Sequence, residues 1–171
     1  MRILRRDIDR LGFDKDFTIY DTDDSIRVIK DCLKDLNLDD KQFPPRTVLG
    51  YISRAKDAMK LAEEYLAECE KSGDYRLAKI AKIYVEYQRR LWEASALDFD
   101  DIILHTVRLL QQFEEVRSFY QRKFRYVLID EYQDTNNLQY LLASTLAGGY
   151  ENFCVVGDDD QSIYRFRGAT I

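Results

Sequence analysis

The chain has 171 residues, of which 46% are hydrophobic and 33% are charged, so its composition is that of a globular protein with a packed core. It has no apolar run of the roughly 18 residues that a membrane span needs, and its basic amino terminus lacks the apolar stretch of a secretory signal. One histidine and three cysteines without a CxxC pair argue against a zinc site and favour reduced, packing cysteines in a cytosolic protein.

The net charge of -5 is distributed unevenly along the chain. Residues 1–125 carry equal numbers of acidic and basic side chains, whereas residues 126–171 carry seven acids and two bases. This overall charge does not indicate a nucleic-acid-binding protein, although an acidic protein can still contain a basic groove. The excess of acid therefore lies in the carboxyl-terminal segment.

The first 125 residues are expected to be mostly helical. Apolar residues at helical spacing follow the acidic start DTDDS, and a pair of prolines, Pro44 and Pro45, ends that segment. The next helical segment, TVLGYISRAKDAMKLAEEYLAEC, is either continuous or broken once, and it ends at the turn KSGD. A long helix then follows, with an expected buried face of Leu77, Ile80, Ala81, Tyr84, Val85, Leu91 and Trp92.

Asp98 is expected to cap a further helix. Its carboxylate can accept a hydrogen bond from the backbone of Asp101, and Leu97 can pack against Ile102 across the cap. His105 lies within this helix, and we expect it to be a packed or half-exposed side chain rather than a catalytic one. The apolar face of the helix would hold Ile102, Thr106, Leu109 and Phe113.

The pattern changes after Arg125. The short apolar run YVLI predicts a strand buried on both faces, NNLQYLLASTLA predicts a helix closed by two glycines, and NFCVV predicts a second buried strand ending at Gly157. This order implies a right-handed parallel unit, in which ligands bind beyond the carboxyl ends of the strands. Asp130 and Glu131 follow the first strand, and residues 158–160 are three aspartates that follow the second. The two acidic clusters are therefore expected to share one crevice.

An aspartate and a glutamate at the end of a buried strand suit metal-assisted phosphate chemistry. Asp130 can hold Mg²⁺, usually through water, because Mg²⁺ keeps part of its hydration shell. Glu131 can then act as a general base on an attacking water. The alternative is that both residues only start a turn and cap the next helix.

The second acidic cluster is followed by residues that suit phosphate and base recognition. Gln161 can donate and accept hydrogen bonds, as sensing a terminal phosphate requires. Tyr164, Arg165, Phe166 and Arg167 alternate aromatic with basic side chains, which suits stacking of bases while cations meet phosphates. The alternative is a core tyrosine and phenylalanine beside solvated arginines.

Four segments together resemble the UvrD/PcrA/Rep group of superfamily-1 DNA helicases. VLIDEYQDTNNLQY is similar to their motif II, and VVGDDDQSIYRFRGA is similar to their motif III. EYQRRLWEASALDFDDIIL resembles the segment before motif II, and MRILRRDIDRLGFDKDFTIYDTDDS resembles the stretch after their first DNA-contacting motif. The resemblance covers essentially the whole chain. It departs at Ser95, where the family pattern has asparagine, which is a local capping matter.

The resemblance implies roles for the motif residues in a 3′–5′ DNA helicase that uses ATP and Mg²⁺. Asp130 would act on Mg²⁺, Glu131 would be the base for ATP hydrolysis, and Gln161 would contact the γ-phosphate and couple it to DNA. Residues implied to bind DNA are Tyr164 and Phe166, which would stack on single-stranded bases, and Arg167. Gln133 and Asp134 belong to motif II with less defined roles. The implied partners are single-stranded and duplex DNA, with no membrane, in the bacterial cytosol and its nucleoid.

The sequence contains no G-x-x-x-x-G-K-S/T loop, which cradles phosphates in such enzymes. We therefore expect an internal fragment that by itself neither binds Mg-ATP nor hydrolyses it. The resemblance implies a fold that is mostly α with a small α/β part. Residues 1–12 would end a preceding RecA-like segment, 13–124 would form a helical 1B-type subdomain, and 125–171 would be a partial RecA-like ATPase domain. Its exposed sheet edges would favour self-association.

Three alternatives remain open at the level of sequence. The first is a haloacid-dehalogenase-like phosphatase with Asp158 as nucleophile, although that family places its D-x-D loop early in the domain. The second is a helical module that binds duplex DNA or a partner protein without catalysis. The third is a related helicase–nuclease subunit with similar motifs.

Overall fold

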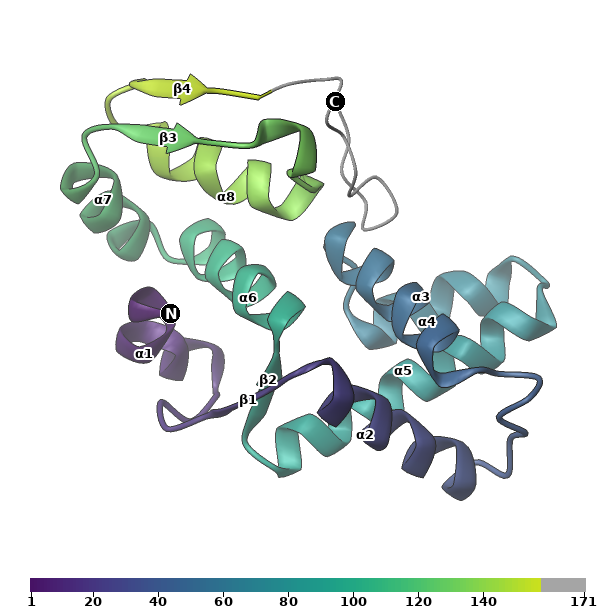
Figure 1. Cartoon of the computed structure of the whole chain (residues 1–171). Coiled ribbons are helices and arrows are strands. Elements are labelled where there is room, and N and C mark those ends of the chain that lie inside the picture. The colour runs from purple at the N-terminus through teal and green to yellow at the C-terminus, as the bar shows by residue number, and fades with distance from the viewer. Residues whose placement is uncertain (158–171) are drawn as a thin grey trace. The chain divides into compact units, whose positions relative to one another are not determined.

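The computed structural model describes residues 1–157, which form two compact units. Residues Asp16–Asp101 make the first, called here the helical unit. Met1–Lys15 together with the segment from Ile102 onward make the second, called here the sheet unit. The elements of the chain, drawn in Figure 1, are α1 (Arg2–Asp7), η1 (Ile8–Leu11), β1 (Thr18–Tyr20), α2 (Thr22–Asp35), α3 (Pro45–Asp57), α4 (Ala62–Lys71), α5 (Tyr75–Glu93), β2 (Ala96–Asp98), α6 (Phe99–Gln112), α7 (Glu114–Lys123), β3 (Val127–Ile129), η2 (Tyr132–Asp134), α8 (Asn137–Ala147) and β4 (Phe153–Val155).

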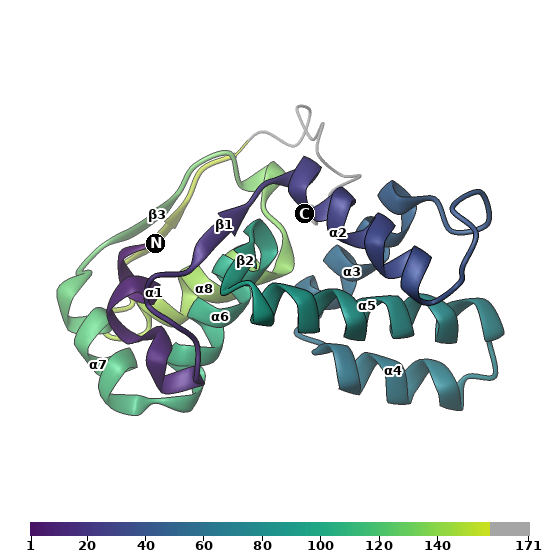
Figure 2. The same ribbon diagram turned by 90° about the horizontal axis from the view of Figure 1, so that it is seen from below.

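Local capping signals set the helix boundaries of the helical unit. The Asp21 carboxylate accepts a hydrogen bond from the Asp24 backbone, and the Asp21 backbone donates one to the Asp24 carboxylate, which makes a capping box at the start of α2. Pro45 occupies the first position of α3, where its missing N–H costs nothing. The segment after α3 is broken at Met59, whose φ is +60°, so α4 is a separate helix that runs along α5 (Figure 2).

The core of the helical unit lies among α2, α3, α4 and α5. Its fully or almost fully buried side chains include Ile29, Cys32, Val48, Ile52, Ile80, Ile83, Tyr84, Tyr87 and Leu91. The buried positions of α5 recur every three or four residues, as the helical period requires. Trp92 was predicted on this buried face, and that prediction is wrong. Trp92 is 51% exposed, because it follows Leu91 directly and so is rotated off the stripe.

The helical unit also contains a short parallel sheet of two strands, β1 and β2, which was not predicted from the sequence. β1 pairs with β2 in the register Thr18 with Ala96 through Tyr20 with Asp98. Just before β2, Ser95 has a φ of +48° and accepts a hydrogen bond from the Thr18 backbone at 2.8 Å. Asparagine adopts this left-handed conformation more readily than serine, which gives a physical reason for asparagine in the family pattern.

In the sheet unit, α1, α6, α7 and α8 contribute to a small apolar cluster. Leu110, Val116 and Tyr120 are buried, and partly buried Ile3, Phe113, Leu142 and Leu146 pack against them. His105 is 2% exposed and its ring lies 4.5 Å from that of Phe13, so the prediction of a packed histidine is confirmed. α8 lies beside the parallel pair β3 and β4, as Figure 1 shows.

The expectation of buried strands is wrong for both β3 and β4 in this chain. In β4, Cys154 and Val155 are exposed. Leu128 is 70% exposed, whereas Val127 and Ile129 are half-buried. Successive side chains of a strand point to opposite faces, and the described residues cover only the face opposite Leu128. The fold class, mostly α with a small α/β part, is confirmed for the described residues. Within residues 1–157, no helix combines the length and apolarity that a membrane crossing requires.

Candidate functional site

The predicted strand–helix–strand unit is present in the sheet unit. β3 and β4 are parallel, with Val127 opposite Phe153 and Ile129 opposite Val155. The ladder continues past the strands, because the Val156 backbone donates to Ile129 at 2.8 Å and the Tyr132 backbone donates to Val156 at 2.9 Å. The residues that follow β3 therefore lie beside the residues that follow β4.

Asp130 and Glu131 occupy this carboxyl edge, and both are exposed to solvent. One oxygen of Asp130, Oδ1, accepts a hydrogen bond from the Glu131 backbone at 2.9 Å. Glu131 has a φ of +51°, a left-handed conformation that is uncommon for a residue with a side chain. Strained residues of this kind are typical of functional turns, where they aim a side chain that a relaxed backbone would turn away.

The alternative interpretation, that these two acids cap the next helix, is not what the structure shows. α8 is capped by Asn136, whose side chain accepts from the Gln139 backbone at 2.9 Å in a capping box. Glu131 precedes the short helix η2 and makes no side-chain cap there. Asp130 and Glu131 do begin a turn, but their carboxylates do not satisfy the amino terminus of either helix.

Gln133 is a buried polar residue of the same turn, and its side chain is 1% exposed. Its amide nitrogen Nε2 donates to Glu131 Oε2 at 2.5 Å. Sequence analysis placed Gln133 and Asp134 in the motif without defining their roles. Asp134 is half-buried at the end of η2.

Several predicted site residues lie outside the described residues. They are Gln161, Tyr164, Phe166 and Arg167, together with the three aspartates at 158–160. The sharing of one crevice by the two acidic clusters, and the phosphatase alternative at Asp158, therefore stay predictions. The described residues place Asp130 and Glu131 at the carboxyl end of β3, between Ile129 and Tyr132, whose backbones both bond to Val156.

The donor set at this edge suits a hydrated magnesium ion. In residues 1–157, no cluster of three or more histidine, cysteine or acidic side chains could enclose a metal. Mg²⁺ is commonly bound by one or two carboxylates plus waters and substrate phosphates rather than by a protein cage. Exposed Asp130 meets that requirement, with Glu131 beside it.

A second group of charged residues is buried in the helical unit. Lys56 is 0% exposed, and its Nζ lies 2.6 Å from Asp98 Oδ2 and 2.9 Å from Asp101 Oδ1. Asp98 and Asp101 form the predicted cap of α6, since the Asp101 backbone donates to Asp98 at 2.8 Å and the Asp98 backbone donates to Asp101 at 3.3 Å. The Tyr87 hydroxyl also donates to Asp98, at 2.8 Å.

This cluster perturbs the pKa values of its members. Burial, and then the carboxylate of Asp98, raise the pKa of Asp101 to about 7. Burial disfavours the charged forms of Asp98 and Lys56, but charge attraction prevails. The carboxylates of Asp101 and Asp98 raise the pKa of Lys56, and Lys56 lowers the pKa of Asp98. Sequence analysis missed Lys56. The available signal was its spacing of four residues from Ile52, which places it on the buried face of α3.

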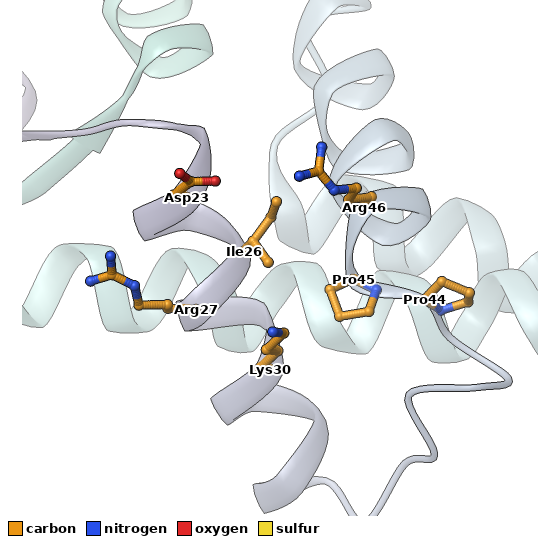
Figure 3. A pocket seen from close by; sticks show the side chains of 7 residues that line it. All are labelled: Asp23, Ile26, Arg27, Lys30, Pro44, Pro45 and Arg46. Carbon is orange, nitrogen blue, oxygen red and sulfur yellow. The ribbon is translucent and has the colours of Figure 1, made fainter.

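A shallow groove with basic walls lies between α2 and α3 of the helical unit (Figure 3). Its volume is about 510 Å³, and its lining residues are Asp23, Ile26, Arg27, Lys30, Pro44, Pro45 and Arg46. Ile26 and Pro45 are half-buried and the three cations are exposed. The groove thus combines a small apolar floor with three cations and one acid.

Comparison with known proteins gives a consistent result. A model of the UvrD/REP helicase N-terminal domain matches residues 1–171. The chain is 50% identical over its whole length to the ATP-dependent DNA helicase PcrA of Bacillus subtilis and 48% identical to that of Staphylococcus aureus strain Mu50. It covers 23% of the length of each of these relatives. The chain therefore belongs to the UvrD/REP helicase N-terminal domain family.

Proposed function

We propose that this chain is a piece of an ATP-dependent DNA helicase that moves 3′–5′ and couples Mg-ATP hydrolysis to duplex unwinding. The observation that carries the proposal is the exposed Asp130–Glu131 pair at the carboxyl edge of a parallel strand pair. The similarity to the PcrA relatives, which are ATP-dependent DNA helicases, supports it. The protein would act on DNA in the bacterial cytosol.

In this proposal the chain's own residues have separate tasks. Mg²⁺, when bound, supplies Lewis-acid stabilisation of phosphate charge. Asp130 would hold a water of the ion, and Glu131 would take a proton from the attacking water as general base. Gln161 would contact the γ-phosphate and couple its presence to DNA binding. Single-stranded bases would stack on Tyr164 and Phe166, and Arg167 would support the DNA.

The domain assignment is also a proposal. The expected division, residues 1–12 and 125–171 as RecA-like segments with 13–124 as a helical 1B-type subdomain, concerns a longer protein. The helical unit, Asp16–Asp101, would correspond to this 1B-type subdomain, which lies between the two RecA-like segments in the sequence. α7 packs with α8 inside the sheet unit. This contact supports placing α7 with the ATPase part.

A chimera tests the function directly. In the Bacillus subtilis relative, the matched segment would be replaced by this chain, and DNA-stimulated ATP hydrolysis and unwinding of a 3′-tailed duplex would be measured. We expect activity, and we expect Glu131→Gln to lower kcat by about 10²–10⁴-fold. The matched control is Glu151→Gln, since Glu151 is likewise exposed and left-handed, with a φ of +55°. Equal effects of the two substitutions would contradict the proposal.

The 171-residue chain alone is expected to be inactive, because its sequence lacks the phosphate-cradling loop. It is also expected to self-associate through the uncovered side of the β3–β4 pair, where Tyr126, Leu128 and Val156 are 75%, 70% and 52% exposed. Sedimentation analysis of the chain and of Leu128→Lys tests this. A monomer at high concentration, or an oligomer that the lysine leaves unchanged, would count against it.

A second candidate function is a helical module that binds duplex DNA, and the groove between α2 and α3 favours it. Arg27, Lys30 and Arg46 could meet phosphates across the groove. The helical unit carries more acids than bases overall, so binding through this groove would be weak and confined to low salt.

The test is a band shift at several salt concentrations. Three phosphate contacts predict a slope of about -2.7 for log K against log salt, and reversing the three groove cations to glutamate should remove binding. A matched variant reverses Lys41, Lys71 and Lys82, which are exposed elsewhere on the helical unit. Binding that ignores salt, or that both variants weaken equally, would exclude the groove.

A further inference from the structure

The buried amide of Gln133 lies between Glu131 and the end of β4. Gln133 Nε2 donates to Glu131 Oε2 at 2.5 Å, so the amide holds one oxygen of the carboxylate. Because Gln133 is 1% exposed, solvent could not replace Glu131 as the partner of its amide if the amide turned away. The second oxygen of exposed Glu131 remains available to a water.

The other end of the amide is constrained by Gly157. A Cβ added to Gly157 would lie 2.7 Å from Gln133 Oε1 and 3.0 Å from the Tyr132 backbone nitrogen. The left-handed glycines of residues 1–157 are Gly12 and Gly73, so Gly157 has a backbone that alanine can adopt. A side chain at 157 would therefore force the Gln133 amide to shift, because the amide oxygen occupies the space that a Cβ would need.

The backbone keeps these three residues together. The Tyr132 amide donates to Val156 at 2.9 Å, and Asp134 donates to the Glu131 carbonyl at 2.9 Å within η2. The turn that carries Gln133 is thereby tied to the exit of β4. A shift of that exit would move the Gln133 amide, and the amide would move the Glu131 carboxylate.

We infer that Gln133 is a positioning residue that fixes the Glu131 carboxylate and links its orientation to the path of the chain at Gly157. The amide is neutral, so it orients the carboxylate without supplying an ion pair. This inference rests on the proposed role of Glu131 in ATP hydrolysis. The contacts among Glu131, Gln133 and Gly157 are independent of that role. The segment after Gly157 leads to Gln161, so the same link offers a route by which that segment can act on the base.

Two substitutions disturb the link from opposite ends. Gln133→Met keeps the length of the side chain and removes the donor. Gly157→Ala leaves both Gln133 and Glu131 intact and displaces the amide by steric contact, with closer approach to Gln133 Oε1 at 2.7 Å than to Tyr132 at 3.0 Å. The matched controls are Gln112→Met at an exposed position and Gly50→Ala, where an added Cβ meets nothing within 4 Å.

The first measurement uses the 171-residue chain and needs no activity. In ¹H–¹⁵N spectra, the Gln133 side-chain amide should be shifted from that of free glutamine and protected from hydrogen exchange. Glu131→Ala and Gly157→Ala should each remove that signature, whereas Gly50→Ala should not. A Gln133 amide that resembles free glutamine in the folded chain, or that ignores both substitutions, would overturn the inference.

The second measurement uses the Bacillus subtilis chimera. Gln133→Met and Gly157→Ala should each lower kcat for ATP hydrolysis by about 10–100-fold, as expected for a misplaced catalytic group, while KM for ATP changes less than about twofold. A rise in KM with unchanged kcat would overturn the positioning role. An unaltered chimera without ATPase activity contradicts the proposed function instead, and the spectra then decide the inference by themselves.

Discussion

Replacing Lys56 with methionine is expected to destabilise the helical unit strongly at pH 8 and much less at pH 5. The side chain is 0% exposed and its Nζ contacts Asp98 and Asp101 at 2.6 and 2.9 Å. Methionine fills nearly the same volume, so the substitution removes the charge with little loss of packing. The two buried carboxylates then lose the ammonium group that both of them contact.

The magnitude follows from the burial of the cluster. Unit charges 4 Å apart attract by about 4 kcal/mol at the effective dielectric constant of a protein, and the two contacts of Lys56 are closer than that. Desolvation of the three groups offsets most of this attraction, so the intact cluster adds little net stability. Removal of one partner alone leaves the desolvation uncompensated, which costs about 3–5 kcal/mol.

The pH dependence follows from Asp101, whose pKa is raised from 3.8 to about 7 in the folded chain. The folded chain therefore holds this proton more tightly than the unfolded chain, and the contribution of Asp101 to stability falls as pH rises from about 4 to about 7. Without Lys56 the pKa of Asp101 should rise further, and the pKa of Asp98, which Lys56 lowers, should rise as well. At pH 5 both carboxyl groups of the variant can be protonated, which removes the cost of burying their charges. At pH 8 protonation itself costs free energy, so the variant is less stable.

Urea unfolding at pH 5 and pH 8, followed by the fluorescence of the single tryptophan, Trp92, measures the effect, because that residue lies on α5 of the helical unit. Lys60→Met is the matched control, since Lys60 pairs with Glu68 at the surface, and it should have a much smaller effect. Adding Asp101→Asn to Lys56→Met should restore part of the loss. A loss at pH 8 below about 1 kcal/mol, or an equal loss at both pH values, would refute the reasoning.

Three further outcomes are expected. Ser95→Asn should raise the unfolding free energy by about 0.5–1 kcal/mol in urea titrations, since asparagine tolerates the φ of +48° better than serine; a destabilised variant would show that the hydroxyl has another role. Asn136→Ala should cost about 1 kcal/mol and speed hydrogen exchange in α8, because it removes the capping box with Gln139, and unchanged exchange would argue that the cap is dispensable. A thiol reagent at pH 8 should modify exposed Cys154 well before Cys32, whose burial raises its pKa to about 12, as mass mapping of the labelled peptides would show; equal labelling of the folded chain would contradict the structure.

The position of Asp130 and Glu131 in the described part of the chain was predictable because its determinants are local. The order strand, acidic pair, capped helix, strand can be recognised from sequence, and parallel pairing then brings Asp130, Glu131 and Gly157 to one edge. The role of Gln133 could not be found in this way. Its contacts run both to its neighbour Glu131 and to a residue on a different strand, and only the folded chain brings Gly157 within reach.

The sequence by itself determined the helix caps, the break at the proline pair and the cap formed by Asp98 and Asp101, because each depends on bonds between residues about three apart. Only the tertiary structure decided the pairing of β1 with β2 and the burial of Lys56. Both features join segments far apart in the chain. Whether a residue is buried or exposed there depends on which distant segment packs over it. On an exposed helix the same lysine would be an ordinary surface charge. Buried between Asp98 and Asp101, it balances the charges of these two carboxylates.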